Sequence, residues 1–178
     1  MNLVDTAIRI AIDAHKDQKR KSDGFPYIAH PFSVALMLQK HGFRDEVVAA
    51  GVLHDVLEDT TVTRDELIAG VGEEVVGMVA ALSEDKSKPW EDRKREYIAA
   101  VATASDEVKA ISTADKISNI TDTLDHCREN PTEFWAKFTR GLSEQRWYYR
   151  TFITDVGARW SHPLMDELKA LVAEFEKY

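Results

Sequence analysis

The chain has 178 residues, of which 44% are hydrophobic and 30% charged, and its formal net charge is −8 at pH 7. This composition excludes a disordered chain and a disulfide-dense mini-protein, and the length fits one domain. A lone cysteine, Cys127, excludes an intrachain disulfide and points to a reducing, cytoplasmic compartment. The acidic balance argues against nucleic-acid binding, and the absence of a long apolar run argues against a membrane span.

Helical periodicity dominates the chain, and no strand-turn-strand alternation interrupts it. Repeats and low-complexity segments are absent. The sequence therefore predicts one all-α domain over residues 1–178, a helical bundle of about eight to ten helices. In chain order, the expected helices cover about 4–15, 31–41, 46–59, 63–70, 73–82, 90–103, 105–126, 132–156 and 163–177.

Local signals predict where several helices begin and end. Pro31 stands where a first-turn proline belongs, and Gly42 stands where a glycine would stop the same helix. Asp45 is expected to cap the third helix, and Thr63 with Glu66 has the form of a capping box for the fourth.

Two helices near the C-terminus carry apolar stripes, which are typical of amphipathic helices docked on a core. Pro163 opens the last of them. The face of 132–156 is expected to be core or a subunit contact. It consists of Trp135, Phe138, Leu142, Tyr149, Phe152 and Val156.

Four polar residues interrupt the apolar third helix. Val47 to Leu53 is apolar nearly all round, and His54, Asp55, Glu58 and Asp59 follow it. Helical spacing places His54 below Glu58 and Asp55 below Asp59. A bound metal cation would compensate three carboxylates on a buried helix. The alternative is that the last turn emerges into water, where its charges are solvated.

Two further segments repeat this pattern. Asp115 interrupts another mostly apolar helix, with Asn119 and Asp122 on the same face. His30 lies between an irregular loop and a helix, a position suited to pointing a side chain into a cleft. Together with His54 and Asp55 these residues offer two imidazoles and two carboxylates, a donor set compatible with Mn²⁺, Fe²⁺ or Zn²⁺.

The order His30, His54-Asp55, Asp115 resembles the HD-domain metal-dependent phosphohydrolases. Within that superfamily, three segments are similar to the hydrolase domain of the bifunctional Rel/Spo alarmone enzymes. They are RKSDGFPYIAHP at 20–31, HDVLEDT at 54–60 and ADKISN at 114–119. The resemblance covers about residues 3–125 well, with C-terminal helices over 132–177 completing the bundle. The chain thus looks like a stand-alone small alarmone hydrolase.

This resemblance implies a role for each matching residue. It implies that Mn²⁺ is held by His30, His54, Asp55 and Asp115. Glu58 and Asp59 would orient and deprotonate the attacking water. The implied substrate contacts are Arg20, Lys21, Tyr27, Asn119 and Asp122.

Three departures from the family pattern flank the nucleoside site. Asp122 stands where many bifunctional enzymes have threonine, Thr121 replaces a common arginine, and Gly24 comes one residue later relative to Arg20. These changes put the identity of the substrate in more doubt than the type of reaction.

We expect a hydrolase that removes pyrophosphate from the 3′ position of guanosine 3′,5′-bis(diphosphate) or a related alarmone. Two alternatives stay open: an HD phosphohydrolase acting on an adenine alarmone, another nucleotide or NADPH, and a nucleotide-binding HD module without turnover. The expected partner is a small nucleotide, with neither nucleic acid nor membrane, and a homodimer is left open.

Overall fold

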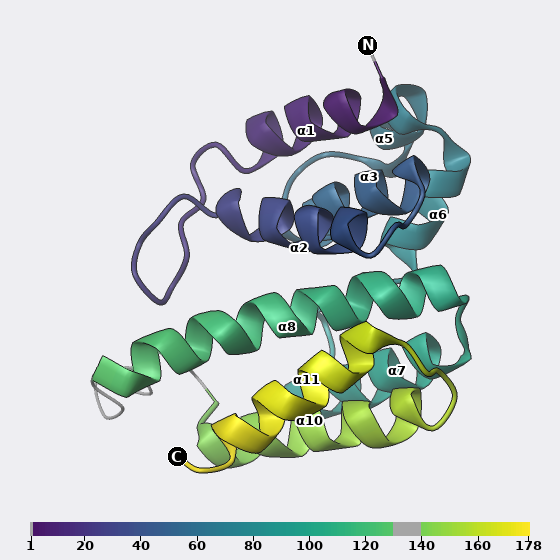
Figure 1. Ribbon diagram of the computed structural model, residues 1–178. Coiled ribbons are helices and arrows are strands. Elements are labelled where there is room, and N and C mark those ends of the chain that lie inside the picture. Colours follow the sequence, from purple (N-terminus) through teal and green to yellow (C-terminus); the bar gives the residue numbers. More distant parts are fainter. Residues whose placement is uncertain (1, 130–139) are drawn as a thin grey trace.

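The computed structural model describes residues 2–129 and 140–178 (Figure 1). These residues form helices and no strand, apart from one bridged pair, Lys19 and Pro26, so the all-α prediction is confirmed. None of the described helices has the length and apolar character that a membrane span requires. The helices are α1 (Leu3–Ala14), α2 (Ala29–Lys40), α3 (Asp45–Leu53), α4 (Val56–Asp59), α5 (Arg64–Val71), α6 (Glu73–Ala80), α7 (Trp90–Thr103), α8 (Asp106–Glu129), α10 (Leu142–Gly157) and α11 (Pro163–Phe175).

The helices form two groups that meet at α8 (Figure 1). On one side, α3 packs against α1, α2 and α6, and α2 and α3 also contact α8. On the other side, α11 and α7 contact α8, and α10 packs against both α7 and α11. Because α8 contacts both groups, side chains along it can meet residues from either group.

Helix α3 is the centre of the first group. Every residue from Val47 to Leu53 is buried, as an all-round apolar helix requires. Gly51 allows α2 to approach closely, because a Cβ at that position would lie 2.5 Å from the Cδ1 atom of Leu38. The close packing of α2 on α3 brings the polar residues that flank the two helices toward the same place.

The helix ends confirm several local predictions. Thr63 and Glu66 form the capping box of α5, with both reciprocal hydrogen bonds present. Pro163 lies in the first turn of α11, and the side chain of His162 caps that helix. Gly42 has a φ of +78°, the left-handed conformation that glycine adopts when it ends a helix.

The prediction of one unbroken helix from Glu46 to Asp59 is wrong. Helix α3 begins at Asp45, so its N-cap is Arg44 and not Asp45 as predicted. It ends at Leu53, before the short α4. His54 and Asp55 form the break, although the backbone of both stays in the right-handed helical region (Asp55 φ −99°, ψ −5°).

Two other predicted boundaries also differ. Helix α2 starts at Ala29, two residues before Pro31. The predicted helix 132–156 is not continuous, because Gly141 is extended (φ −80°, ψ −173°) and α10 begins at Leu142. Trp135 and Phe138, which were expected on its apolar face, lie outside the described residues.

Candidate active site

The four predicted metal ligands come together between the two groups of helices. His30 lies in the first turn of α2, His54 and Asp55 at the α3–α4 break, and Asp115 midway along α8. The Nε2 atom of His30 lies 3.0 Å from Oδ1 of Asp115 and 3.7 Å from Oδ2 of Asp55. Nε2 of His54 lies 3.0 Å from Oδ2 of Asp55 and 3.6 Å from Oδ1 of Asp115. We call these four residues the metal end of the site.

Each side chain of the metal end is held by a second contact. Nδ1 of His54 lies 2.8 Å from the carbonyl oxygen of Gly51, and Nδ1 of His30 lies 2.9 Å from Oγ of Ser118. The hydroxyl group of Tyr27 donates a hydrogen bond to Oδ2 of Asp55. The amide of Asn119 donates to Oδ1 of Asp115 over 2.6 Å. Such outer contacts fix the orientation of metal-binding side chains.

The residues at the metal end fit a divalent cation. A carbonyl oxygen only accepts hydrogen bonds, so Nδ1 of His54 carries a proton and Nε2 presents a lone pair in the neutral ring. That Nε2 atom is buried without a hydrogen bond and faces two carboxylates. Donor atoms of His30, His54 and Asp115 lie within 4.8 Å of one another. Two imidazole nitrogens with carboxylate oxygens are ligands for Mn²⁺, Fe²⁺ or Zn²⁺.

The charges at the metal end stabilise one another. Burial acts to lower the pKa of His54, but the carboxylates of Asp55 and Asp115 raise it well above its ordinary value. Burial acts to raise the pKa of Asp115, but Lys116 and the two imidazoles hold it well below its ordinary range. A proton on an imidazole ring or a bound metal ion therefore offsets the charge of these carboxylates. The proton and the metal ion compete for the same imidazole nitrogen atoms.

Glu58 and Asp59 lie on α4, one turn beyond the metal end. Oε2 of Glu58 accepts a hydrogen bond of 3.1 Å from the backbone N–H of Glu84. Burial raises the pKa of Glu58. Lys86, from the loop before α7, lies 3.5 Å from Oε1 of Glu58 and forms an ion pair with Asp59. Gln18 donates a hydrogen bond of 3.0 Å to the carbonyl oxygen of Asp59 and so ties α4 to the loop after α1.

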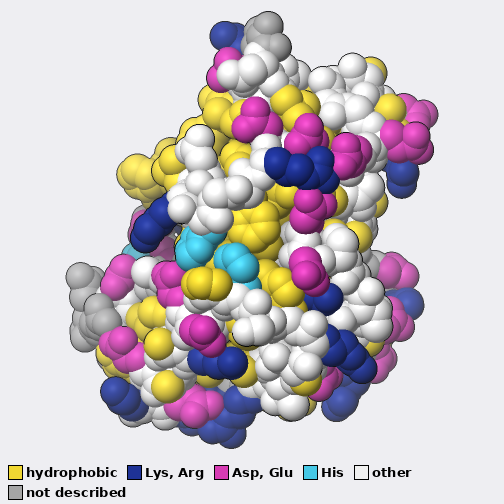
Figure 2. All heavy atoms as spheres, turned by 45° about the vertical axis from the view of Figure 1, so that its right-hand side comes forward, with side chains coloured by type: hydrophobic (Ala, Val, Ile, Leu, Met, Phe, Trp, Pro, Cys, Tyr) yellow, Lys and Arg dark blue, Asp and Glu magenta, His cyan; other side chains and the backbone are white. Residues whose placement is uncertain are grey.

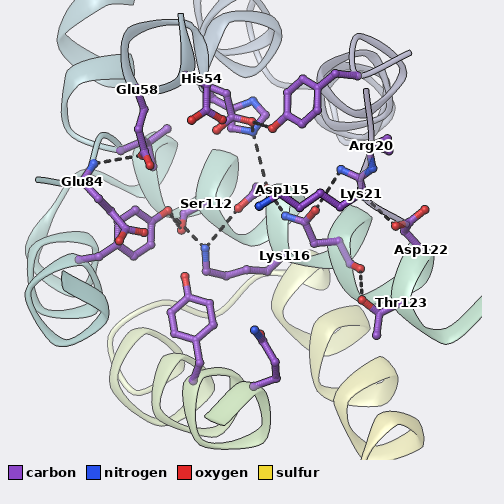
Figure 3. A pocket seen from close by; sticks show the side chains of 18 of the residues that line it. Arg20, Lys21, His54, Glu58, Glu84, Ser112, Asp115, Lys116, Asp122 and Thr123 are labelled. Atoms are coloured by element: carbon purple, nitrogen blue, oxygen red, sulfur yellow. Dashed lines mark hydrogen bonds and ion pairs between the residues drawn. The ribbon is translucent and has the colours of Figure 1, made fainter. Parts of the chain in front are cut away.

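The remaining predicted residues lie where that loop meets α8. Arg20 forms a 3.0 Å ion pair with Asp122 and donates a 3.3 Å hydrogen bond to Oδ1 of Asn119. Figure 3 shows Arg20, Lys21 and Asp122 gathered on this side of the site. We call Arg20, Lys21, Asn119 and Asp122 the nucleoside end. Tyr27 lies apart from it, because its hydroxyl group contacts the metal end.

A cavity of about 540 Å³ joins the two ends. His54, Asp55, Glu58, Asp59 and Asp115 line it, together with Tyr27 and all four residues of the nucleoside end. Sequence reasoning left out other lining residues. These are foremost Lys116, Tyr97 and Tyr148.

The molecular surface carries both signs of charge. Acidic and basic side chains are interspersed on the face shown in Figure 2, and histidine side chains gather at one place on it. Apart from His30 and His54 of the metal end, His41 and His162 also lie close together, with ring centroids 5.4 Å apart, and His162 caps α11. These two residues do not line the cavity.

Comparison with known proteins identifies the class that this fold and site define. A family model described as the HD domain matches residues 7–138, and the chain belongs to this family. Its relatives include the guanosine-3′,5′-bis(diphosphate) 3′-pyrophosphohydrolase MESH1 of Danio rerio, 36% identical over 71% of this chain and 74% of that protein. The human MESH1 protein is 38% identical over 68% of this chain and 69% of its own length. The resemblance predicted from the motifs is therefore confirmed.

A longer relative and two solved structures extend the comparison. The Aquifex aeolicus protein named guanosine-3′,5′-bis(diphosphate) 3′-pyrophosphohydrolase is 36% identical over 76% of this chain but only 20% of its own length. The structure of lmo0812 from Listeria monocytogenes matches with a TM-score of 0.75 and 37% identity, over 86% of this chain and 97% of that one. A metazoan ortholog of SpoT matches with a TM-score of 0.85 over 98% and 96% of the two chains; at 24% identity, this likeness shows the fold alone.

Proposed function

We propose that this protein is a metal-dependent hydrolase that removes pyrophosphate from the 3′ position of guanosine 3′,5′-bis(diphosphate) or a close analogue. One observation carries the proposal: His54, Asp55, Asp115 and a partly buried Glu58 line a cavity that also holds basic residues, and His30 lies against Asp55 and Asp115 beside it. Relatives that align with about 70% of the chain carry the name of this activity.

The proposed cation is Mn²⁺, held by the four residues of the metal end. Bound there, Mn²⁺ would lower the pKa of a water molecule and draw electron density from the phosphoryl oxygen. The mixture of imidazole and carboxylate donors supports this assignment over Mg²⁺, which prefers oxygen ligands alone.

Glu58 and Asp59 are the proposed bases. Glu58 is the stronger candidate, because burial raises its pKa and so makes its carboxylate a better proton acceptor near neutral pH. Water would add to the phosphorus atom attached to the ribose, and its proton would pass to the carboxylate. The bond from phosphorus to the 3′ oxygen breaks, so the water oxygen leaves with pyrophosphate and the ribose oxygen takes up a proton.

The nucleoside end is the proposed binding site for the rest of the substrate. Arg20 and Lys21 would meet the purine and its phosphates, and Asn119 and Asp122 the ribose, with Tyr27 bordering the metal end. The ion pair with Arg20 compensates the charge of Asp122. Asp122 is therefore not expected to repel a 2′-phosphate strongly, and an NADPH-type substrate belongs in the assay panel.

The buried Cys127 supports a reducing, cytoplasmic location, and the net charge of −8 supports a protein that binds neither nucleic acid nor membrane. Residues 1–178 are proposed to act as one domain. A homodimer stays open.

Product analysis tests the proposal. Purified protein with Mn²⁺ is incubated with guanosine 3′,5′-bis(diphosphate), its adenine counterpart and NADPH, and the products are separated by ion exchange. We expect guanosine 5′-diphosphate and pyrophosphate in equal amounts. Glu58→Gln should slow their formation by about 100-fold or more, whereas Glu73→Gln, at an exposed carboxylate in the first turn of α6, should not. Stepwise release of orthophosphate would refute the reaction, and turnover of only a different substrate would refute the specificity.

A further inference from the structure

The side of the cavity opposite the nucleoside end contains a buried lysine. Lys116 follows Asp115 on α8 and is only 2% exposed, yet it lines the cavity. Its ammonium nitrogen lies 3.3 Å from the hydroxyl oxygen of Tyr97 and 3.4 Å from Oδ2 of Asp115 (Figure 3). The same nitrogen lies 4.5, 4.7 and 5.3 Å from the ring centroids of Tyr97, Phe152 and Tyr148. We call these four residues (Lys116, Tyr97, Tyr148 and Phe152) the Lys116 cluster.

Lys116 differs from two other cations that line the cavity, because each of those has a close carboxylate partner. Arg20 is paired with Asp122 at 3.0 Å, and Lys94 with Glu84 at 2.5 Å. The carboxylate contact of Lys116 is longer, and it shares that carboxylate with the two histidines of the metal end. A buried ammonium group next to aromatic rings is well placed to bind an anion, because its attraction is weakly screened there.

Position along α8 shows which part of a substrate could reach this cluster. Asn119 lies one turn beyond Asp115, toward the nucleoside end, whereas Ser112 lies one turn before it and contacts the Tyr97 hydroxyl at 2.7 Å. Asn119 and Ser112 are about 10 Å apart along the helix, at 1.5 Å per residue. A substrate with its nucleoside at Asn119 and its reacting phosphorus near Asp115 would therefore extend toward Lys116.

We propose that the Lys116 cluster binds the outer phosphate of the pyrophosphate group that leaves. This inference rests on the proposed function, and it assigns roles to residues that the metal and nucleoside ends do not include. The Lys116 ammonium supplies charge, and the Tyr97 and Tyr148 hydroxyl groups supply hydrogen bonds. Lys94, whose nitrogen lies 4.9 Å from the Tyr148 ring, borders the site but is paired with Glu84.

Separate binding measurements for the two products test this assignment. Calorimetric titration of the Mn²⁺-loaded protein with pyrophosphate and with guanosine 5′-diphosphate gives one affinity for each. Lys116→Met should weaken pyrophosphate binding by about 10- to 100-fold, the range of a lost hydrogen bond to a charged group. Tyr97→Phe should weaken it by about 2- to 10-fold, as expected for a neutral hydrogen bond. Binding of guanosine 5′-diphosphate and the metal content should not change.

Lys109→Met is the matched control. Lys109 lies two turns earlier on α8, is 7% exposed, pairs with Asp106 and does not line the cavity. It should leave both affinities unchanged. If Lys116→Met does not fold by circular dichroism, the selective effect of Tyr97→Phe decides the matter.

The outcomes separate the inference from the proposed function. Unchanged pyrophosphate affinity in the folded variants overturns the inference, and so does an equal loss for both products, which would mean that Lys116 acts only through Asp115. If pyrophosphate binding depends on Lys116 but the protein does not hydrolyse guanosine 3′,5′-bis(diphosphate), the inference stands and the proposed function fails.

Discussion

The metal end and the nucleoside end are held in different ways. At the metal end, each of the four side chains has an outer partner: Ser118, the Gly51 carbonyl, Tyr27 or Asn119. Three helical segments supply the four side chains, and both histidines are buried. At the nucleoside end, Arg20 lies on the loop between α1 and α2, and its ion pair is with Asp122, another residue of the same end.

The metal end is arranged for one ligand, a cation, whereas Arg20 at the nucleoside end must exchange Asp122 for the substrate. The metal end presents its donor atoms in place, so binding a cation requires little rearrangement. Arg20 must give up part of its contact with Asp122 before it can bind a phosphate. We therefore expect substitutions at the metal end to remove activity and substitutions at the nucleoside end to adjust it.

Loss of the metal should have the largest effect. Removal of the cation with a chelator, or Asp115→Asn, should abolish hydrolysis, and Asp166→Asn, at an exposed residue of α11, should have no effect. A cation bound only by the native state at a hundred times its Kd adds about 2.7 kcal/mol to the free energy of unfolding. Thermal denaturation with and without Mn²⁺ checks this. Full activity in rigorously metal-free protein would contradict the account.

Glu58→Gln should lower turnover by about 100-fold or more, the effect typical of a lost general base. Metal content should stay at the wild-type level, because Glu58 lies outside the metal end. Turnover and metal content measured on the same preparation check both statements. Normal turnover of this variant would remove Glu58 from the mechanism and leave Asp59 as the base.

Tyr27→Phe tests whether the outer contacts of the metal end matter. Loss of the hydrogen bond to Asp55 should weaken metal affinity by about 10- to 100-fold. Tyr178→Phe, at an exposed residue, is the control. Metal titration followed by calorimetry gives the affinities. If Tyr27→Phe instead raises only KM for the nucleotide, Tyr27 belongs to the substrate site.

The pH dependence of turnover should follow Glu58. Because burial raises its pKa, kcat at saturating metal should fall about tenfold per pH unit below a midpoint that lies above the ordinary glutamate range.

The raised pKa of Glu58 also has a consequence for stability. The stabilising contribution of protonated Glu58 is present below the ordinary pKa and is lost as pH rises through the raised one. Glu58→Gln should therefore gain stability relative to wild type as pH rises through that window, which denaturant titrations at several pH values would show.

Asp122→Asn should have the smallest effect. It frees Arg20 for the substrate, and the partly exposed ion pair contributes only about 0–1 kcal/mol to stability. We expect KM to change by a few-fold, kcat to stay the same, and unfolding to shift little. A large loss of kcat would show that the nucleoside end is as rigidly held as the metal end.

The sequence predicted most of the helices, because their signals are local. The capping box at Thr63 and the proline at 163 depend on neighbours in the chain, and they appear as expected. Polar residues such as Asp115 interrupt apolar helices, where an uncompensated charge would be unfavourable. The family motifs group these residues in one site.

Features that depend on distant packing were not predictable in this way. The break at His54 and Asp55 lies in a segment whose apolar pattern continues as Val56 and Leu57, so no local signal marks it. Lys116 belongs to no local signal that would mark it as a site residue. Rings from α7 and α10, about 20 to 40 residues away in the chain, bury it beside the cavity.

Hydrolysis in water enriched in heavy oxygen shows which phosphorus–oxygen bond breaks. We place the attack on the phosphorus atom attached to the 3′ oxygen, beside the metal end and Glu58. One heavy oxygen atom is then expected in the released pyrophosphate and none in guanosine 5′-diphosphate, as measured by mass spectrometry of both products. Heavy oxygen in the nucleoside product, or its appearance in orthophosphate alone, would contradict the account.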